Sequence, residues 1–341
     1  MRTEAWPVSE RAAALHRSAL VWDNVFPINL PGEVELGNSW DELQRFHDAG
    51  VDVVSITLAG DNHNISQAFS LCAWARRQLR EHEERMVLVR RVSDIELARG
   101  TNRLGIILHF EGTRCFERDP SAIELFYDLG IRQTLLTFNK QNSAGGGCAD
   151  AEDGGLTAYG RRLVAEMHRV GMLLDLSHTG YRTSLDAMAV APKPVLFSHS
   201  NAHALCPSFR NLKDDQIRAC AESGGVVGVS GSSEYLGDFE CSNDTLFRHI
   251  NYMVEIAGID HVGLGLDMVF DPKSLSEWVR GRPDEWPMAQ APEWAGFRYA
   301  RPEQLPGLTE LMLQHGYSEV EIRKVLGENL LRVCRAVWRE D

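Results

Sequence analysis

Four side chains that can bind a metal ion or carry a proton stand at or near the carboxyl ends of four different apolar runs in this chain. They are Glu111, His178, His199 and Asp267. A single carboxylate at such a place is often a helix cap, and a single histidine is often a hydrogen-bonded core residue. Because all four occupy equivalent places, they predict one shared site rather than four unrelated structural roles.

The residue types indicate metal-dependent hydrolysis. Two imidazoles and one carboxylate suit a catalytic zinc ion, which takes three protein ligands and leaves a fourth position for water. The ion lowers the pKa of that water to about 7, so hydroxide is available at neutral pH. We therefore predict that Glu111, His178 and His199 bind the metal. Asp267, the second predicted catalytic residue beside Glu111, would hold the water and pass its proton to the leaving amine.

The other histidines are weaker candidates. His109 precedes Glu111 by two residues on one predicted strand, so both side chains face the same way and His109 is a candidate to support the ligand. Histidines within helical stretches, among them His16, His168 and His249, are expected at the protein surface.

The elements that must position these residues are eight short apolar runs, most of which are followed by a stretch of helical period. Nearly continuous apolar runs are typical of parallel strands that are covered on both faces. The alternation predicts one (β/α)8 TIM barrel domain over residues 1–341, with the active site at the carboxyl ends of the strands. A doubly wound open sheet is the structural alternative. The predicted strands are 19–24, 51–59, 105–112, 132–139, 171–178, 193–200, 224–231 and 261–268.

The segment 271–306 interrupts this rhythm after the eighth predicted strand. It carries Trp278, Trp286 and Trp294 among several prolines. A loop of this length is usually functional or disordered, and its aromatic residues argue against disorder. It leaves the barrel on the catalytic side, so one interpretation is a lid or a subunit contact over the site. The other is a loop that packs on the protein surface without a role in the site.

The last predicted helix begins at a capping box. Ser318 is followed three residues later by Glu321, and apolar residues continue at helical spacing to Trp338. We expect one continuous helix over 318–338.

The composition excludes two classes of partner. The chain has a formal net charge of -13, and so acidic a surface repels nucleic acid and anionic membranes. No apolar run approaches the roughly 20 residues that span a membrane, and the N-terminal residues lack the apolar stretch of a signal peptide. The seven scattered cysteines, without a CxxC pair, indicate free thiols in a reducing compartment. We therefore expect a cytoplasmic protein.

Several motifs of the chain occur together in one known family. They are FEGT at 110–113, LLDLSHTGYRTSLDAM at 173–188, the run 193–217, HVGLGLD at 261–267 and the run 305–333. The most specific are the paired Ser-His steps, the second of which is followed by Arg-Asn eleven residues further on. By these motifs, which cover most of residues 105–340, the chain resembles the renal (membrane) dipeptidase family of zinc peptidases.

The resemblance implies a (β/α)8 barrel that hydrolyses dipeptides with a pair of zinc ions, in a family that often forms homodimers. By position, Glu111 is similar to the carboxylate that bridges the two ions, and His178 and His199 are similar to the imidazoles on one of them. Asp267 matches the aspartate that assists proton transfer. Arg210 matches the arginine that pairs with the dipeptide carboxylate, for which a bidentate guanidinium is well suited.

The chain departs from the family pattern at the first predicted strand. There the family has Asp-Gly-His-Asn-Asp, and this chain has Asp23-Asn24-Val25-Phe26-Pro27. If Asp23 aligns with the first aspartate, Val25 and Pro27 replace the histidine and the second aspartate. If Pro27 is the anchor, Asp23 takes the place of the histidine and Val25 that of the aspartate. Either way the other metal loses a ligand, so we predict one retained metal site and a weakened or empty partner site, with Asp23 as a remaining candidate ligand.

A second departure follows the fourth predicted strand. Phe138 stands where the family commonly has a histidine that contacts substrate, and we expect Phe138 and Asn139 to contact substrate here. Asp61 and His63, just after the second predicted strand, are candidate substitute ligands for the metal, although their segment also fits the loop before a helix.

Three functional interpretations follow. The first is a zinc-dependent dipeptidase with one or two metal ions. The second is a hydrolase of the same fold that acts on another small amide or ester, because Phe138 alters the substrate contacts. The third is a non-catalytic relative that has lost its metal pair, which the retention of Arg210 and Asp267 disfavours.

Overall fold

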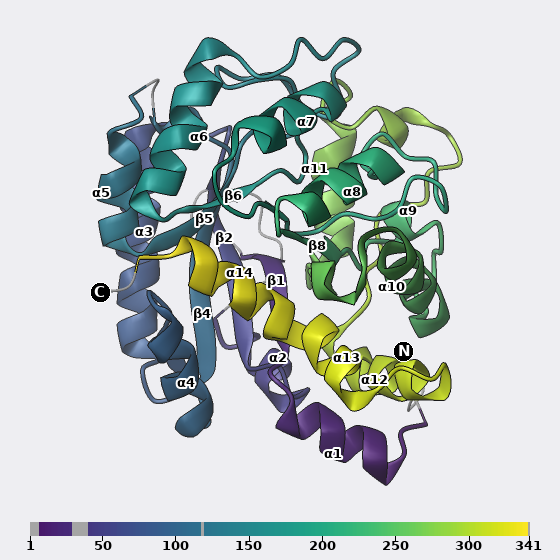
Figure 1. The fold of residues 1–341 in the computed structure, drawn as a ribbon. Coiled ribbons are helices and arrows are strands. Elements are labelled where there is room, and N and C mark those ends of the chain that lie inside the picture. Colours follow the sequence, from purple (N-terminus) through teal and green to yellow (C-terminus); the bar gives the residue numbers. More distant parts are fainter. Residues whose placement is uncertain (1–6, 29–39, 117–118, 340–341) are drawn as a thin grey trace.

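The strands form a nearly closed barrel. The computed structural model describes residues 7–28, 40–116 and 119–339, and in it eight parallel strands pair in the order β1-β2-β4-β5-β6-β7-β8-β9 (Figure 1). Because this order follows the chain, the predicted (β/α)8 barrel is confirmed and the doubly wound alternative is excluded. The strands are β1 Trp22–Pro27, β2 Val53–Gly60, β3 Met86–Leu88, β4 Leu104–Glu111, β5 Ile131–Leu135, β6 Leu173–Asp175, β7 Leu196–Phe197, β8 Val226–Val229 and β9 Val262–Leu264.

Each of the eight predicted runs contains or overlaps one barrel strand. Most runs are longer than their strands, because their last residues no longer pair with a neighbouring strand and belong to the loops of the rim. The run 193–200, for example, contains β7, which has only two residues. The prediction missed β3, a run of three residues that lies outside the main strand order. β3 pairs with residues 104–106 of β4, whereas β5 pairs with β4 from Leu108 onward.

The barrel closes between β9 and β1 without a regular ladder. The backbone N–H of Asp267 donates to Val25 O at 3.2 Å, and that of Leu266 donates to Asp23 Oδ1 at 2.7 Å. A β-bulge shifts the register of β1 on β2 between Asp23 and Phe26. Asp23 is fully buried, and its side chain accepts the hydrogen bond of a backbone N–H that has no partner in a regular strand pairing at this seam.

The helices surround the barrel, and α14 crosses its N-terminal end (Figure 1). Inward residues near the starts of the strands, such as Val53, Leu173 and Val226, pack in one cluster with Leu330 and Val333 of α14. Full burial of each such side chain stabilises the fold by about 1.5–3 kcal/mol. Because α14 covers this end, the opposite rim is the one left open for a site. The helices are α1 Glu10–Ser18, α2 Gln44–Asp48, α3 Ile65–Glu81, α4 Val92–Gly100, α5 Ala122–Leu129, α6 Ala158–Val170, α7 Tyr181–Val190, α8 Asp214–Glu222, α9 Ser233–Leu236, α10 Asn243–Ala257, α11 Pro272–Arg280, α12 Leu305–Gln314, α13 Glu319–Arg323 and α14 Asn329–Val337.

The prediction of one continuous helix over 318–338 is wrong, because the helix is interrupted. Its capping box is confirmed, because Ser318 Oγ accepts from Glu321 N and Glu321 Oε2 accepts from Ser318 N. A π-helical turn at Lys324–Glu328 then separates α13 from α14. A Cβ at Gly327 would lie 2.6 Å from Leu20 O, so the chain passes too close to the segment before β1 for any residue with a side chain.

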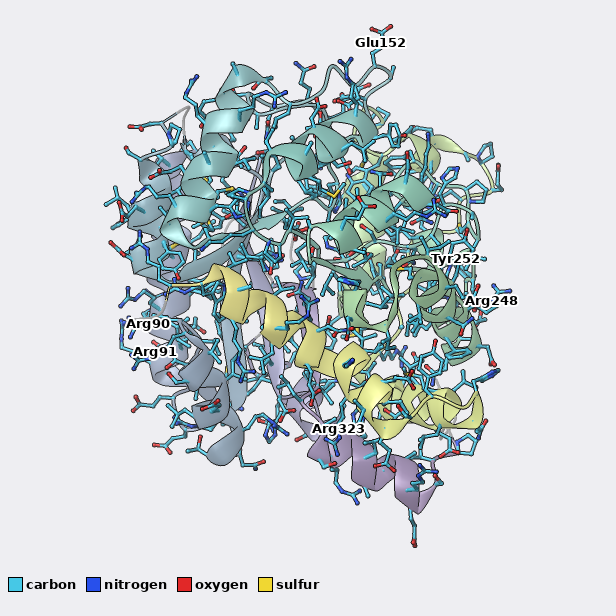
Figure 2. All side chains as sticks on the ribbon, viewed as in Figure 1. Arg90, Arg91, Glu152, Arg248, Tyr252 and Arg323 are labelled. Carbon is cyan, nitrogen blue, oxygen red and sulfur yellow. The ribbon has the colours of Figure 1, made fainter. Side chains whose placement is uncertain are left out.

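Charged side chains cover the outside of the barrel. Arg91, Glu152 and Arg248 are exposed and project away from it, as Figure 2 shows. Among the described residues, no helix combines the length and the apolar character that crossing a membrane requires.

Three helical histidines are buried, which corrects the surface position expected from the sequence. His16, His168 and His249 are at most 2% exposed, because they lie on the faces of their helices that pack on the rest of the protein. Burial lowers the pKa of each to about 4. Neither ring nitrogen of His168 has a hydrogen-bond partner within the described part of the chain.

We expect His168 to make the fold sensitive to acid. Its pKa of about 4 in the folded protein lies below the ordinary 6.5. The contribution of neutral His168 to the free energy of unfolding is therefore complete above pH 6.5 and is lost as the pH falls towards 4. The loss at the lower limit is on the order of 3 kcal/mol. The free energy of unfolding in urea should therefore fall less between neutral pH and pH 4 in His168→Met than in wild type. The exposed His315→Met variant is the control, and an equal fall in all three proteins would contradict the prediction.

Candidate metal centre

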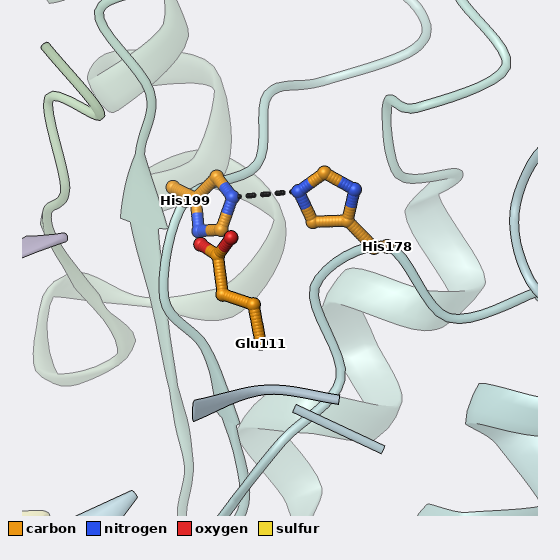
Figure 3. A group of neighbouring side chains, drawn as sticks. All are labelled: Glu111, His178 and His199. Carbon is orange, nitrogen blue, oxygen red and sulfur yellow. Dashed lines mark hydrogen bonds between the residues drawn. The ribbon is translucent and has the colours of Figure 1, made fainter. Parts of the chain in front are cut away.

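Glu111, His178 and His199 come together at the carboxyl ends of β4, β6 and β7. One ligand atom of each lies within 4.8 Å of the others, and the described residues contain no second group of three or more such side chains. The Nε2 atoms of the two histidines are 2.9 Å apart. Figure 3 shows the carboxylate of Glu111 beside the ring of His199. Three strand ends thus deliver three potential ligands to one point.

The surroundings of His178 determine which of its ring nitrogens faces the cluster. Its Nδ1 lies 2.7 Å from Asn139 Oδ1, and Asn139 Nδ2 donates to Glu285 O at 3.1 Å. A backbone carbonyl only accepts, so the amide nitrogen of Asn139 faces Glu285 and its oxygen accepts the Nδ1 proton of the imidazole. The unprotonated Nε2 of His178 is therefore the nitrogen that faces His199.

A buried layer of hydroxyl and carboxylate groups supports His199. Ser198 Oγ lies 2.7 Å from its Nδ1, and Ser177 Oγ accepts from Ser198 Oγ at 3.2 Å and from His199 N at 3.1 Å. The carboxylate of Asp175 accepts from the backbone N–H of Ser177 at 3.0 Å and of Ser198 at 3.1 Å. The two Ser-His steps of the sequence therefore cross-link the ends of β6 and β7.

The electrostatics of the cluster fit a divalent cation. Burial lowers the pKa of His178 and His199 well below the ordinary value, and the positive charge of Arg210 lowers both further. Both imidazoles are therefore neutral at neutral pH, which is the form that binds a metal. Oε1 of Glu111 is buried and without a hydrogen-bond partner among the residues described. Two neutral imidazoles and an unpartnered carboxylate oxygen are a donor set that zinc accepts.

His109 lies on β4 on the same face as Glu111, as the period of the strand predicts. Its Nε2 is 2.7 Å from Thr57 Oγ1 and 3.9 Å from Glu111 Oε1. The side chain is fully buried. His109 therefore underlies the cluster without belonging to it.

Asp267 follows β9 at the same rim. Burial raises its pKa well above the ordinary range, the neighbouring carboxylate of Glu111 raises it further, and Arg210 opposes the rise. Its backbone φ is +57°, and Asn139 and His178 also have positive φ, of 40° and 63°. Residues other than glycine seldom adopt this conformation, and where it occurs it often marks a functional site.

A cavity of about 950 Å³ opens beside the cluster. Glu111, His178 and Asp267 line it, and the segment 271–306 forms one of its walls. The wall is largely aromatic, so the space next to the candidate ligands is shielded from bulk water on that side. The residues that this segment contributes are Leu275, Trp278, Arg282, Glu285, Trp286, Phe297 and Tyr299.

The residues predicted to contact substrate separate into two groups. Phe138 lines the cavity, and its ring stacks on His178 with the centroids 4.3 Å apart. Arg210 and Asn139 are buried and are not part of the cavity lining. Arg210 donates to His199 O at 2.7 Å and to Ser200 Oγ at 2.8 Å, and its Nε has no partner among the described residues.

Asp23, Asp61 and His63 lie outside the three-residue group. Asp23 accepts through Oδ1 at the seam between β9 and β1, and its Oδ2 is buried without a hydrogen-bond partner among the described residues. Burial raises its pKa to about 7. Asp61 accepts from Phe138 N at 3.0 Å and from Asn142 Nδ2 at 2.9 Å, so its carboxylate anchors a loop. The segment that carries Asp61 and His63 leads into α3, which agrees with the alternative prediction of a loop before a helix.

Two aromatic residues of the site were not among the predicted site residues, although Trp286 belongs to the segment 271–306 that was a candidate lid. Trp286 and Tyr235 line the cavity, and Trp286 Nε1 and the Tyr235 hydroxyl are buried without partners among the described residues. Polar atoms left unpaired at a cavity wall are available to a ligand. The density of aromatic residues in 271–306 was the only signal for Trp286, and Tyr235 had none.

Comparisons with known proteins identify a family for this chain. Residues 61–278 match the family model described as Membrane dipeptidase (Peptidase family M19). The chain is 34% identical over 267 residues to an uncharacterized protein in the pqqA 5' region of Klebsiella pneumoniae, covering 75% of this chain and 90% of that protein. It is 36% identical over 191 residues to an uncharacterized dipeptidase of Schizosaccharomyces pombe, covering 52% of this chain and 45% of that protein. The structure of an amidohydrolase from Pseudomonas aeruginosa matches with a TM-score of 0.86 at 28% identity, over 96% of this chain and 99% of that one.

Proposed function

Because the chain belongs to the membrane dipeptidase family, we propose that it hydrolyses the amide bond of dipeptides at a zinc site formed by Glu111, His178 and His199. The observation that carries the proposal is the ligand cluster beside the cavity, with the two Nε2 atoms 2.9 Å apart and Glu111 Oε1 without a hydrogen-bond partner among the described residues. A buried acceptor without a partner costs about 1–3 kcal/mol, and a cation between these groups would remove that cost.

The chemistry divides between the ion and the protein. When bound, zinc supplies a water whose pKa is about 7. Burial raises the pKa of Asp267, which favours the protonated form of the carboxyl group and supports a role in passing a proton to the leaving amine. Arg210 has five N–H donors, and among the described residues it makes two side-chain hydrogen bonds. Its remaining donors and its charge support a role in attracting the substrate carboxylate.

One zinc ion per chain is the expected stoichiometry. The side chains of Val25 and Pro27 offer no ligand atom. Asp23 Oδ1 accepts from Leu266 N at 2.7 Å, so Asp23 Oδ2 alone remains as a candidate ligand atom of these three residues. Within the described residues only one group of three potential ligands forms. The first strand therefore offers no complete second site.

The proposal is tested by removing and restoring the metal. Protein treated with a chelator should be inactive, and added Zn2+ should restore hydrolysis of L-L or L-D dipeptides with about one zinc per chain in elemental analysis. Protein that holds no zinc, and whose melting temperature zinc does not raise, would contradict the site and favour the non-catalytic interpretation. Zinc-loaded protein that cleaves another small amide or ester but no dipeptide would keep the site and change the substrate class.

A further inference from the structure

Asn139 connects His178 to the segment 271–306. Its amide oxygen accepts from His178 Nδ1 at 2.7 Å and from Cys148 Sγ at 3.2 Å, and its amide nitrogen donates to Glu285 O at 3.1 Å. The side chain is fully buried. Because two donors meet its oxygen and a carbonyl meets its nitrogen, one orientation of the amide satisfies all three contacts.

The same segment contacts His178 a second time through Trp286, the residue after Glu285. The ring of Trp286 lies edge-on to His178, with the centroids 6.3 Å apart, and edge-on to Phe138, with the centroids 5.9 Å apart. Phe138 in turn stacks on the face of His178. The loop after β5 and the segment 271–306 therefore hold the imidazole on its face, at its edge and at Nδ1, and its Nε2 faces the cluster.

We propose that Asn139 is a positioning residue that couples the docking of segment 271–306 to the orientation of His178. The proposal rests on the proposed function, because it takes His178 to be a zinc ligand. The docked segment orients the amide, and the amide keeps the imidazole proton on Nδ1, so that Nε2 is free for the metal. By linkage, zinc binding must stabilise the docked segment in return. Metal binding and docking of the cavity wall then favour each other.

The backbone at Asn139 dictates the choice of variants. Its φ is +40°, so glycine can replace it without strain, whereas alanine would add a backbone effect. Asn139→Gly removes both the bond to His178 and the bond to Glu285 O. Asn139→Asp keeps an acceptor for His178 and places an oxygen against the carbonyl of Glu285, which breaks only the second bond. Asn102→Gly is the matched control, because Asn102 is exposed after α4 and has a φ of 52°.

Zinc affinity, measured by competition with a chromophoric chelator, should fall about 10–100-fold in Asn139→Gly. It should stay within roughly threefold of wild type in Asn139→Asp and in Asn102→Gly, because both retain the acceptor at Nδ1 of His178. Hydrogen–deuterium exchange gives the readout for the segment. Added Zn2+ should slow exchange in residues 282–288 of wild type and Asn102→Gly, and should not do so in Asn139→Asp.

The outcomes separate the two proposals. Wild type that binds no zinc would end the proposed function and this inference with it. Wild type that binds zinc, together with full affinity in Asn139→Gly, would overturn the positioning role alone. Protection of residues 282–288 by zinc that persists in Asn139→Asp would overturn the coupling to the segment. If Asn139→Gly does not fold, the comparison of Asn139→Asp with wild type still decides the coupling.

Discussion

Replacing His199 with alanine should abolish zinc binding and hydrolysis together. His199 offers its Nε2 to the cluster and is held by Ser198 at Nδ1, so alanine leaves two of the three predicted ligands. Loss of a group that only supports a ligand costs about 10–100-fold in metal affinity, so loss of the ligand itself should cost at least about 100-fold. Elemental analysis after gel filtration and kcat/KM on the best dipeptide measure both effects.

His261→Ala is the control for this experiment. His261 stands at the start of β9, at the end of the barrel away from the site, and its Nδ1 lies 2.8 Å from Gly225 O. That variant should keep its zinc and its turnover. Unchanged turnover in His199→Ala would remove His199 from the catalytic site.

The second large effect is expected from Asp267→Asn. Asparagine keeps the shape of the side chain and tolerates the φ of +57°, but it cannot carry the proton. We expect kcat to fall by about 10²–10⁴-fold while the zinc content stays at the wild-type level. Steady-state kinetics and elemental analysis of the same preparation check the two parts.

Asp244→Asn is the matched control, because Asp244 is an exposed carboxylate in the first turn of α10. It should leave kcat and zinc content unaltered. Zinc loss in proportion to activity in Asp267→Asn would make Asp267 a ligand rather than a proton carrier. An unaltered kcat would exclude the proton-transfer role.

The barrel was predictable because burial on both faces leaves a parallel strand with a nearly continuous apolar sequence. The two errors in the predicted helices and strands were local. β3 has only three residues and depends on pairing with β4. The break before α14 lies at Gly327, where a Cβ would come within 2.6 Å of Leu20 O, and no helical pattern reveals that close approach.

Part of the site was also accessible, since a (β/α)8 barrel brings the carboxyl ends of its strands to one rim. Glu111, His178 and His199 could be grouped from their places in the runs, and the structure brings their ligand atoms within 4.8 Å of one another. Asp23 could not be judged in the same way. The bulge in β1 and the seam with β9 decide where its carboxylate lies.

The sequence by itself determined the order of strands and helices and the residue types at the rim, because both are properties of one element at a time. Only the tertiary structure decided what each side chain meets. Asn139 and Glu285 are 146 positions apart, and Asp23 and Leu266 are 243 positions apart. Hydrogen bonds at such separations depend on how loops from different strands pack over the rim, and the spacing of residues along the chain carries no record of that packing.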